Sequence, residues 1–213
     1  MNKVFILDLD GTLLDSMGAW QNVGVKYLKT KGFTDIPPDL PSILKQLTIL
    51  ESANYIKTGW NIDLPQQTIA DEINELMAQF YQNEVELKDG VSEFFERYKD
   101  HKMCIATATD RYLVEHALKR VGLEDRFEFI ITSTEMGNSK RQPDIFIEAA
   151  KRLSSEIKDA IVFEDALHAV VSATSVGFYT VGVYDESFKH ETEQIKEVAN
   201  EFFYNLSDWR LNQ

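Results

Sequence analysis

Short apolar stretches with the composition of buried strands recur along the chain, and most of them end where polar residues begin. We predict strands at residues 4–7, 103–106, 129–131, 160–163 and, less sharply defined, 179–183. Helical patterns follow most of these stretches, as in the spacing of four that separates Ile145, Ala149 and Leu153. Strands that alternate with helices predict βαβ units, and therefore an α/β fold built on a parallel sheet with helices on both faces.

Residues 16–87 interrupt this alternation, because they contain helical patterns and no clear strand. The clearest pattern places apolar residues at Ile69, Ile73, Leu76 and Phe80. Four of the five prolines of the chain lie in this segment and divide it into about four helices. We therefore expect a core of residues 1–15 and 88–213 with an inserted all-helical domain of residues 16–87, although a helical extension of the core would also explain the pattern.

The first predicted strand leads directly into Asp8-Leu9-Asp10-Gly11-Thr12. Alternate side chains of an extended segment point to the same side, so we expect Asp8 and Asp10 to lie close together. Gly11 then allows a sharp turn with a positive φ. Two neighbouring carboxylates repel each other unless a cation lies between them, so this segment is a candidate metal site as well as a simple turn that caps a helix.

Glu164 and Asp165 form a second acidic pair, directly after the predicted strand at residues 160–163. On its own, this pair is explained equally well by an aspartate that caps the following helix. In a parallel sheet, however, the carboxyl ends of the strands meet at one edge, where ligands bind. Four carboxyl groups, with no histidine or cysteine among them, favour a hard cation that prefers oxygen ligands, such as Mg²⁺.

Two further segments carry weaker signals. Lys140 lies in a polar loop ahead of a helix that we expect to begin near Pro143. Thr107, Ala108 and Thr109 follow the second predicted strand, where hydroxyls and backbone N–H groups can hold an oxyanion. A single lysine or threonine is usually part of the solvated surface. The order of these residues between the two acidic pairs is more informative than either of them alone.

That order resembles the haloacid dehalogenase (HAD) superfamily: Asp-x-Asp-Gly-Thr, a threonine at a second strand end, a lysine in a loop, and Glu-Asp at another strand end. The phrases LDLDGTLLDS (residues 7–16), KRQPDIF (residues 140–146) and VFED (residues 162–165) are similar to its phosphatase and β-phosphoglucomutase-like branch. The resemblance implies a Rossmann-like catalytic core and a helical cap domain, which would be residues 16–87.

The resemblance also implies a role for each acidic residue of the first motif. Asp8 would be the nucleophile that accepts the phosphoryl group, and it would also bind Mg²⁺. Asp10 would protonate the leaving alkoxide and then activate water, and its backbone carbonyl would be a further Mg²⁺ ligand. A covalent aspartyl-phosphate splits one difficult step into two easier ones.

The remaining motif residues would bind phosphate or metal. Thr107 and the amide of Ala108 would hold the phosphoryl oxygens, and Lys140 would neutralise them. Asp165 would complete the metal site, with Glu164 as a ligand or as a residue that holds water. Without a divalent cation, the acidic groups would repel a phosphate monoester.

The charge balance and the single cysteine narrow the expected partners. The 213-residue chain has 22 basic and 35 acidic residues and a formal net charge of −13, so we expect neither nucleic acid nor an anionic membrane surface as a partner. Cys104, the single cysteine, forms no disulfide or thiolate metal site within one chain. Asp8 interrupts the N-terminal apolar stretch too early for a signal peptide, and no stretch approaches the ~20 apolar residues of a membrane span. We therefore expect a cytoplasmic protein.

Together these features predict an Mg²⁺-dependent phosphatase that hydrolyses a small phosphate monoester, such as a sugar phosphate or a similar metabolite. A phosphosugar mutase that resembles β-phosphoglucomutase is the main alternative. Such mutases hold a second phosphate with an arginine and a histidine of the cap, whereas here the first arginine is Arg97 and the first histidine is His101, both after the predicted cap. Arg111 and Arg141, on core loops, remain available for an anionic group.

A catalytically idle binding protein on the same fold is a further alternative, because a fold does not fix a function. The presence of all four acidic residues favours an enzyme over this alternative. The sequence specifies neither the substrate, nor the cap residues that select it, nor the oligomeric state.

Overall fold

The computed structural model describes residues 3–44, 47 and 49–211, and the chain divides into two compact units. The core unit comprises Met1–Ser16 and Val85–Gln213, and the helical unit comprises Met17–Glu84. The two ends of the core unit that lead into and out of the helical unit run side by side. Leu14 and Leu87 form an antiparallel bridge, and the Asp15 N–H donates a 3.0 Å hydrogen bond to the Glu86 carbonyl.

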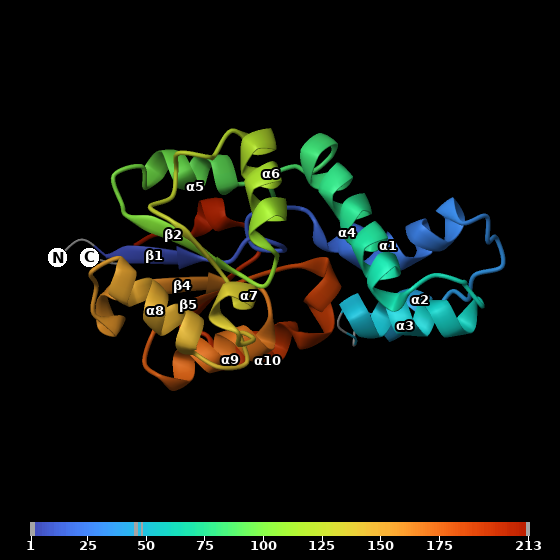
Figure 1. Ribbon diagram of the computed structural model, residues 1–213. Helices are drawn as coiled ribbons and strands as arrows, with labels where there is room; N and C mark the ends of the chain where they lie inside the picture. The colour runs from blue at the N-terminus through green and yellow to red at the C-terminus, as the bar shows by residue number, and fades with distance from the viewer. Residues whose placement is uncertain (1–2, 45–46, 48, 212–213) are drawn as a thin grey trace. The chain divides into compact units, whose positions relative to one another are not determined.

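A six-stranded sheet, formed within the described residues, organises the core unit (Figure 1). In spatial order its strands are β3 (Ile130–Thr132), β2 (Met103–Thr107), β1 (Val4–Leu7), β4 (Ala160–Glu164), β5 (Tyr179–Val183) and β6 (Glu201–Phe203). Every strand is parallel to its neighbours, so the predicted α/β fold is confirmed. The sequence pattern does not predict β6, because it is only three residues long and half-buried at the edge of the sheet.

Helices cover both faces of the sheet, as Figure 1 shows. One side carries α5 (Val91–Arg97) and α6 (Arg111–Val121), and the other carries α8 (Asp144–Arg152), α9 (Leu167–Ser175) and α10 (Thr192–Val198). Alternate residues of β1 therefore enter different cores. Val4 and Ile6 pack in a cluster with residues of α8 and α9, whereas Phe5 contacts the rings of Phe94 and Trp209. Because both faces are apolar, the central strands are recognised in the sequence as continuous apolar runs.

Shorter elements complete the core unit. The sequence pattern also predicts one of the longer helices, α8, correctly. The short elements are α7 (Ser133–Met136) and the 3-10 helices η1 (Ile157–Asp159), η2 (Glu186–Glu191) and η3 (Leu206–Asp208). Helix α8 begins directly after Pro143, as expected. Its predicted apolar side is confirmed, because Ile145, Ala149 and Leu153 are all buried.

The helical unit, within its described residues, contains α1 (Met17–Thr30), α2 (Leu40–Leu44), α3 (Ile49–Gly59) and α4 (Gln66–Asn83). Helix α4 packs against both α1 and α3. Ile69 and Ile73 of its predicted apolar side are buried, whereas Leu76 and Phe80 are only half-buried. Met77, Ala78 and Tyr81 are the buried residues of those last turns. Two of these buried residues, Met77 and Tyr81, lie one position after the predicted ones, because a helix with 3.6 residues per turn allows apolar residues to be spaced by either three or four.

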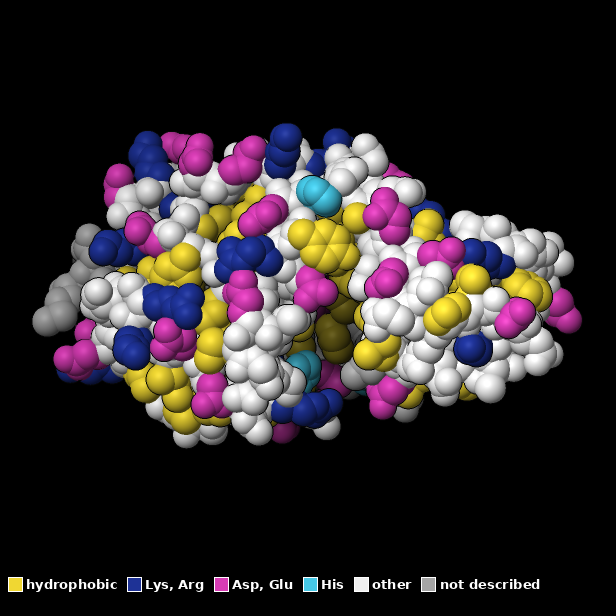
Figure 2. Space-filling view, viewed as in Figure 1, with side chains coloured by type: hydrophobic (Ala, Val, Ile, Leu, Met, Phe, Trp, Pro, Cys, Tyr) yellow, Lys and Arg dark blue, Asp and Glu magenta, His cyan; other side chains and the backbone are white. Residues whose placement is uncertain are grey.

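Charged side chains of both signs are interspersed over each unit on the face shown in Figure 2. The excess of acidic residues is therefore not collected in one patch on this face. Within the described ranges, no helix has both the length and the apolar character that crossing a membrane requires.

Candidate functional site

The candidate site lies at the carboxyl end of the sheet, where β1 and β4 end side by side. The register pairs Leu7 with Phe163, so Asp8 and Glu164 follow as neighbours. The Asp8 N–H donates a 3.0 Å hydrogen bond to the Phe163 carbonyl and so extends this pairing beyond the strand. Gly11 then turns the chain with a φ of +87°, a conformation that glycine adopts without steric cost. The strand register thus brings the first residues of the two acidic pairs together.

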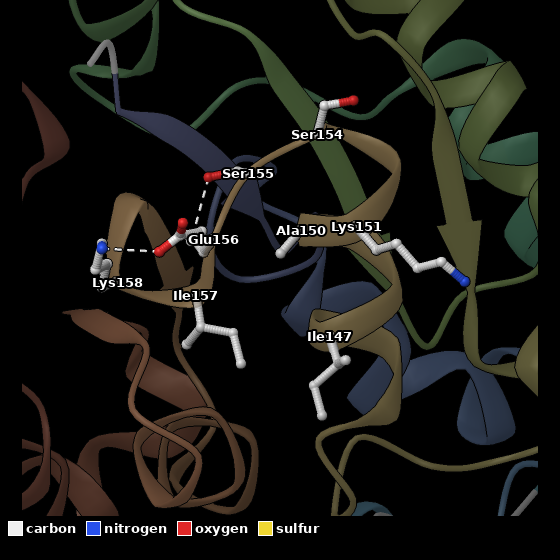
Figure 3. A pocket seen from close by; sticks show the side chains of 8 residues that line it. All are labelled: Ile147, Ala150, Lys151, Ser154, Ser155, Glu156, Ile157 and Lys158. Atoms are coloured by element: carbon white, nitrogen blue, oxygen red, sulfur yellow. Dashed lines mark hydrogen bonds and ion pairs between the residues drawn. The ribbon is translucent and has the colours of Figure 1, made fainter.

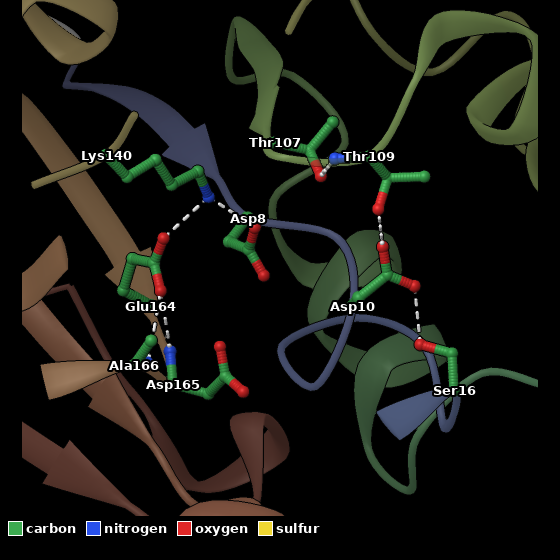
Figure 4. Close-up of polar contacts among 9 residues, drawn as sticks. All are labelled: Asp8, Asp10, Ser16, Thr107, Thr109, Lys140, Glu164, Asp165 and Ala166. Carbon is green, nitrogen blue, oxygen red and sulfur yellow. Dashed lines mark hydrogen bonds and ion pairs between the residues drawn. The ribbon is translucent and has the colours of Figure 1, made fainter. Parts of the chain in front are cut away.

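Lys140 is the cation of this site (Figure 4). It lies in the loop between α7 and α8, and only 5% of its side chain is exposed. Its Nζ donates hydrogen bonds to Asp8 Oδ1 and, at 2.6 Å, to Glu164 Oε1. The other Glu164 oxygen accepts the N–H groups of Asp165 and Ala166 at 3.1 and 3.2 Å. One oxygen of Glu164 is therefore engaged by the lysine and the other by the backbone.

Three buried carboxylates are close enough to share a cation. Asp8, Glu164 and Asp165 each bring one oxygen within 4.8 Å of the others. Asp165 Oδ2 is buried and has no hydrogen-bond partner within the part of the chain that the structure describes. A buried carboxylate oxygen without a partner is unfavourable, and hard divalent cations bind such oxygens well. The chemistry of this donor set therefore fits a divalent cation.

Burial dominates the ionisation of these groups. It raises the pKa of Asp8 to about 6, although Lys140 opposes this shift and Glu164 adds to it. Burial also raises the pKa of Asp165, and the charges of Asp8 and Glu164 raise it further. Burial alone would lower the pKa of Lys140, but the two adjacent carboxylates raise it above its ordinary value. Lys140 is therefore charged at neutral pH, and one positive charge does not balance three carboxylates.

Asp10 lies outside this cluster, and hydroxyl groups hold its carboxylate. Ser16 Oγ donates to Asp10 Oδ1 at 2.5 Å, and Thr109 Oγ1 donates to Asp10 Oδ2 at 2.6 Å (Figure 4). Thr107 Oγ1 in turn accepts the Thr109 N–H at 3.1 Å. Among the described residues, Asp8 belongs to the group of carboxylates that could share one cation, and Asp10 does not. The side chains of Asp8 and Asp10 therefore do not meet at one point, although their spacing in the sequence suggests that they would.

The remaining predicted residues lie at the end of the neighbouring strand. Strand β2 pairs directly with β1, and Thr107 is its last residue. Thr107 is buried, and Ala108, which follows it, is exposed. The segments singled out in the sequence thus end at adjacent positions along one edge of the sheet.

Sequence reasoning does not predict which residues bind the Asp10 carboxylate, although it marks Thr109 as a candidate for holding an oxyanion. Ser16 closes the LDLDGTLLDS phrase, and Thr109 lies two residues after Thr107, so both belong to segments that the sequence marks. A hydroxyl residue carries no signal that identifies its partner, however. The pairing of Thr109 with Asp10 joins residues 99 positions apart and becomes visible only in the fold.

The two core arginines that were candidates for binding a second anionic group differ in availability. Arg111 forms an ion pair with Glu135 and donates a 2.9 Å hydrogen bond to the Ile130 carbonyl. Arg141 follows Lys140 in the chain and is exposed. Arg141 is therefore the more accessible of the two.

A groove of about 690 Å³ opens elsewhere on the core unit (Figure 3). Ile147 and Lys151 of α8 line one part of it, and Glu156 and Lys158 line another. The second part precedes β4, so the groove lies toward the amino ends of the strands, and no predicted site residue lines it. This groove is therefore not the candidate functional site.

Comparison with known proteins links the motifs to one family. A family model described as haloacid dehalogenase-like hydrolase matches residues 5–183, a range that includes every predicted site residue. The chain is 26% identical to a bifunctional riboflavin kinase/FMN phosphatase from Arabidopsis thaliana, over 100% of this chain but only 56% of that protein. It is 27% identical to a β-phosphoglucomutase from Bacillus subtilis (strain 168), over 85% of this chain and 83% of that protein.

Solved structures share the fold. The crystal structure of a HAD hydrolase, family IA, variant 3, from Entamoeba histolytica matches with a TM-score of 0.80 at 24% sequence identity. The match covers 98% of this chain and 96% of that one. The fold likeness therefore extends over nearly the whole chain.

Because burial raises the pKa of Asp8, we predict that pH changes the stability of the metal-free protein through this residue. Between the ordinary value of 3.8 and the value of about 6 in the folded chain, the folded state binds more protons than the unfolded state. Stability therefore falls as pH rises through this window and levels off above about pH 6. The D8N variant lacks this proton site. We therefore compare the Tm of D8N with that of the wild type by thermal unfolding in EDTA. The difference, Tm of D8N minus Tm of the wild type, should increase by several degrees between about pH 4 and about pH 7.

The control for this measurement is D15N, which changes an exposed carboxylate in the loop that follows the same strand. Its Tm should follow that of the wild type across the whole pH range. Parallel curves for D8N and the wild type would contradict a raised pKa at Asp8.

Proposed function

We propose that the chain, which belongs to the haloacid dehalogenase-like hydrolase family, is an Mg²⁺-dependent phosphatase that hydrolyses small phosphate monoesters through an aspartyl-phosphate on Asp8. The observation that carries the proposal is the buried contact between Asp8 and Lys140, beside the Asp165 oxygen that has no hydrogen-bond partner in the described chain. A positioned nucleophile, a fixed cation and an oxygen suited to a metal are what phosphoryl transfer requires.

Asp8 is the nucleophile in this proposal. Lys140 binds Asp8 Oδ1 and orients the carboxylate, and burial limits the access of bulk water. One carboxylate oxygen attacks phosphorus, the bond between phosphorus and the ester oxygen breaks, and the phosphoryl group is transferred to Asp8. The attack requires the ionised carboxylate, so positive charge bound nearby must lower the raised pKa of Asp8 in the working enzyme.

Asp10 first supplies a proton and then removes one. Its carboxyl group protonates the departing ester oxygen, and the resulting carboxylate takes a proton from the water that attacks the aspartyl-phosphate. Ser16 and Thr109 hold the two oxygens of Asp10 at 2.5 and 2.6 Å, which supports a fixed orientation for this proton transfer. The separation of Asp10 from the acidic cluster suits an acid and base rather than a second nucleophile.

Lys140 and the end of β2 bind the phosphoryl oxygens. An ammonium group has three N–H donors, and the contacts with Asp8 and Glu164 use two of them, so among the described residues one donor is left for a phosphoryl oxygen. Thr107 and the backbone amide of Ala108 follow the strand that pairs with β1 and supply neutral donors. Donors of this kind stabilise the charge that develops on the transferred group.

Asp8, Asp165 and the backbone carbonyl of Asp10 are the groups that would hold Mg²⁺. When bound, the cation offsets the negative charge of the carboxylates and of the phosphate. Glu164 supports the site from outside, because its two oxygens already bind Lys140 and the backbone. A donor set made only of oxygen favours Mg²⁺ over softer metals.

We expect water, rather than a second hydroxyl of the substrate, to discharge the phosphoryl group from Asp8. The helical unit, which we assign as the cap of the enzyme, has neither arginine nor histidine in residues 17–84. A mutase must hold its bisphosphate while the molecule reorients, and lysine lacks the bidentate geometry with which arginine holds phosphate. The similarity to a β-phosphoglucomutase keeps a phosphosugar mutase as the second candidate.

The partner we infer is a phosphorylated small metabolite, such as a sugar phosphate. The names of the two relatives refer to phosphorylated small molecules. We also infer a cytoplasmic location, which agrees with a single buried cysteine thiol.

Metal dependence is the first test of the proposal. EDTA should abolish release of phosphate from p-nitrophenyl phosphate, and Mg²⁺ should restore it. Ca²⁺ should bind but inhibit, because its looser and higher coordination misplaces the nucleophile. The D165N variant should need at least about tenfold more Mg²⁺ for half-maximal activity, whereas D15N should match the wild type. Full activity of the chelated wild type would contradict the metal site.

The second test separates a phosphatase from a mutase. We predict steady release of inorganic phosphate from small phosphate monoesters, without a bisphosphate activator, because water competes well when no clamp holds a second phosphate. Incubation with β-glucose 1-phosphate should yield little glucose 6-phosphate. Coupling to glucose-6-phosphate dehydrogenase measures the isomer, and a phosphate assay on the same sample measures hydrolysis. Rapid isomer formation with far slower phosphate release would identify a mutase.

A further inference from the structure

Lys88 uses all three of its N–H donors on a single junction near the candidate site. Its Nζ donates to the Gly11 carbonyl at 2.5 Å, to the Tyr184 carbonyl at 2.6 Å and to Asp185 Oδ2 at 2.9 Å. The Lys88 side chain is 18% exposed and that of Asp185 is 8% exposed. A lysine that buries its ammonium group and satisfies every donor is held in one position rather than left in solvent.

The junction joins three segments that lie far apart in the sequence. Gly11 directly follows Asp10, Lys88 lies in the connection out of the helical unit, and Tyr184 directly follows β5. The turn that contains Asp10 is already closed by a 3.0 Å hydrogen bond from the Gly11 N–H to the Leu14 carbonyl. The Lys88 N–H adds a 2.9 Å bond to the Leu13 carbonyl. Lys88 therefore holds this turn in place with hydrogen bonds from both its backbone and its side chain.

Lys88 also neutralises the charge of Asp185. Asp185 Oδ1 accepts the Ser187 N–H at 2.9 Å, which fixes the carboxylate while its other oxygen binds Lys88. Lys88 and Asp185 thus form a poorly solvated ion pair beside the turn that follows Asp10. Without Lys88, the poorly solvated carboxylate of Asp185 would lose the cation that neutralises it.

We propose that Lys88 is a positioning residue, which orients Asp10 through the Gly11 carbonyl and neutralises Asp185 at the same junction. The inference rests on the proposed phosphatase function, in which Asp10 acts as the general acid and base. It also extends the site to Lys88 and Asp185, which no motif includes. Lys88 touches neither the phosphate nor the reacting atoms in this proposal and acts only through the groups that it holds.

The K88M variant separates this role from a merely structural one. Its kcat should fall at least about tenfold, because displacement of a catalytic group by about 1 Å is that costly. Its KM should stay within about twofold, because phosphate binding is left to other residues. Its Mg²⁺ dissociation constant, measured by calorimetry without substrate, should stay the same or decrease, because the loss of a cation makes the site more negative.

The matched control is K3M. Lys3 also binds a carboxylate and a backbone carbonyl, although one carbonyl fewer than Lys88, with its Nζ 2.8 Å from the Lys158 carbonyl and 2.9 Å from Asp159 Oδ1. It precedes β1, at the end of the strand opposite to the candidate site. The K3M variant should therefore keep the kcat and the Mg²⁺ affinity of the wild type, even if it loses some thermal stability.

Chemical rescue tests whether a lysine-like side chain at position 88 restores activity. Alkylation of a K88C variant with 2-bromoethylamine rebuilds a side chain of nearly the length and charge of lysine. Cys104, the natural cysteine, is fully buried and should not react. Treated K88C should regain most of its lost kcat, whereas treated wild type should be unchanged. If K88M unfolds because Asp185 is left unpaired, K88M/D185N removes that charge and should fold but still show the low kcat.

Two results would overturn the proposal. One is a K88M variant with the kcat of the wild type. The other is a parallel loss of kcat and Mg²⁺ affinity that alkylation of K88C does not reverse, because this is the mark of general disruption. Failure of the proposed function itself would look different, since the wild type would then release no phosphate. In that case the proposal is still tested by the Mg²⁺ dissociation constants of K88M and the wild type, measured by calorimetry. Weaker Mg²⁺ binding by K88M would contradict the proposed charge balance.

Discussion

The contact of Lys140 with Asp8 and Glu164 is the interaction on which the rest of the candidate site depends. Two carboxylates can remain buried at the end of a parallel sheet only if a cation is close to both, because desolvation penalises each negative charge. Lys140 meets this need with direct contacts to both carboxylates. It does so incompletely, because Asp165 adds a third buried carboxylate with one oxygen left unpaired among the described residues. The electrostatic imbalance is the physical reason for expecting a metal.

The fold explains why these groups meet. Strands β1 and β4 are parallel neighbours, so their carboxyl ends necessarily lie together, and the register leaves Asp8 beside Glu164. The sheet itself is held by apolar packing on both faces. Stability and chemistry are thus supplied by different residues. The unfavourable cluster of acids is tolerated because the sheet and its helices do not rely on it.

The sequence predicts the parts of this arrangement that depend on strand direction and on local pattern. The apolar runs before Asp8 and Glu164 are sufficient to place both acids at one edge, and the HAD-like motifs add Lys140. Contacts that depend on the exact path of a loop are not predictable in this way. The hydroxyl of Thr109 and the ammonium group of Lys88 reach their partners across distant parts of the chain, and no local pattern marks either pairing. Strand β6 is missed because a short edge strand has little apolar signal.

The central claim is that Asp8 becomes phosphorylated, and the most direct measurement is to trap that intermediate. Borohydride reduces an acyl phosphate to an alcohol, so quenching a reaction at steady state with borohydride should convert Asp8 to homoserine. Mass spectrometry of the peptide that contains residues 4–16 would identify the change. We predict this product in the wild type only when both substrate and Mg²⁺ are present, and none in D8N. Turnover of substrate by the wild type without modification at Asp8, or modification at another acidic residue, would contradict the account.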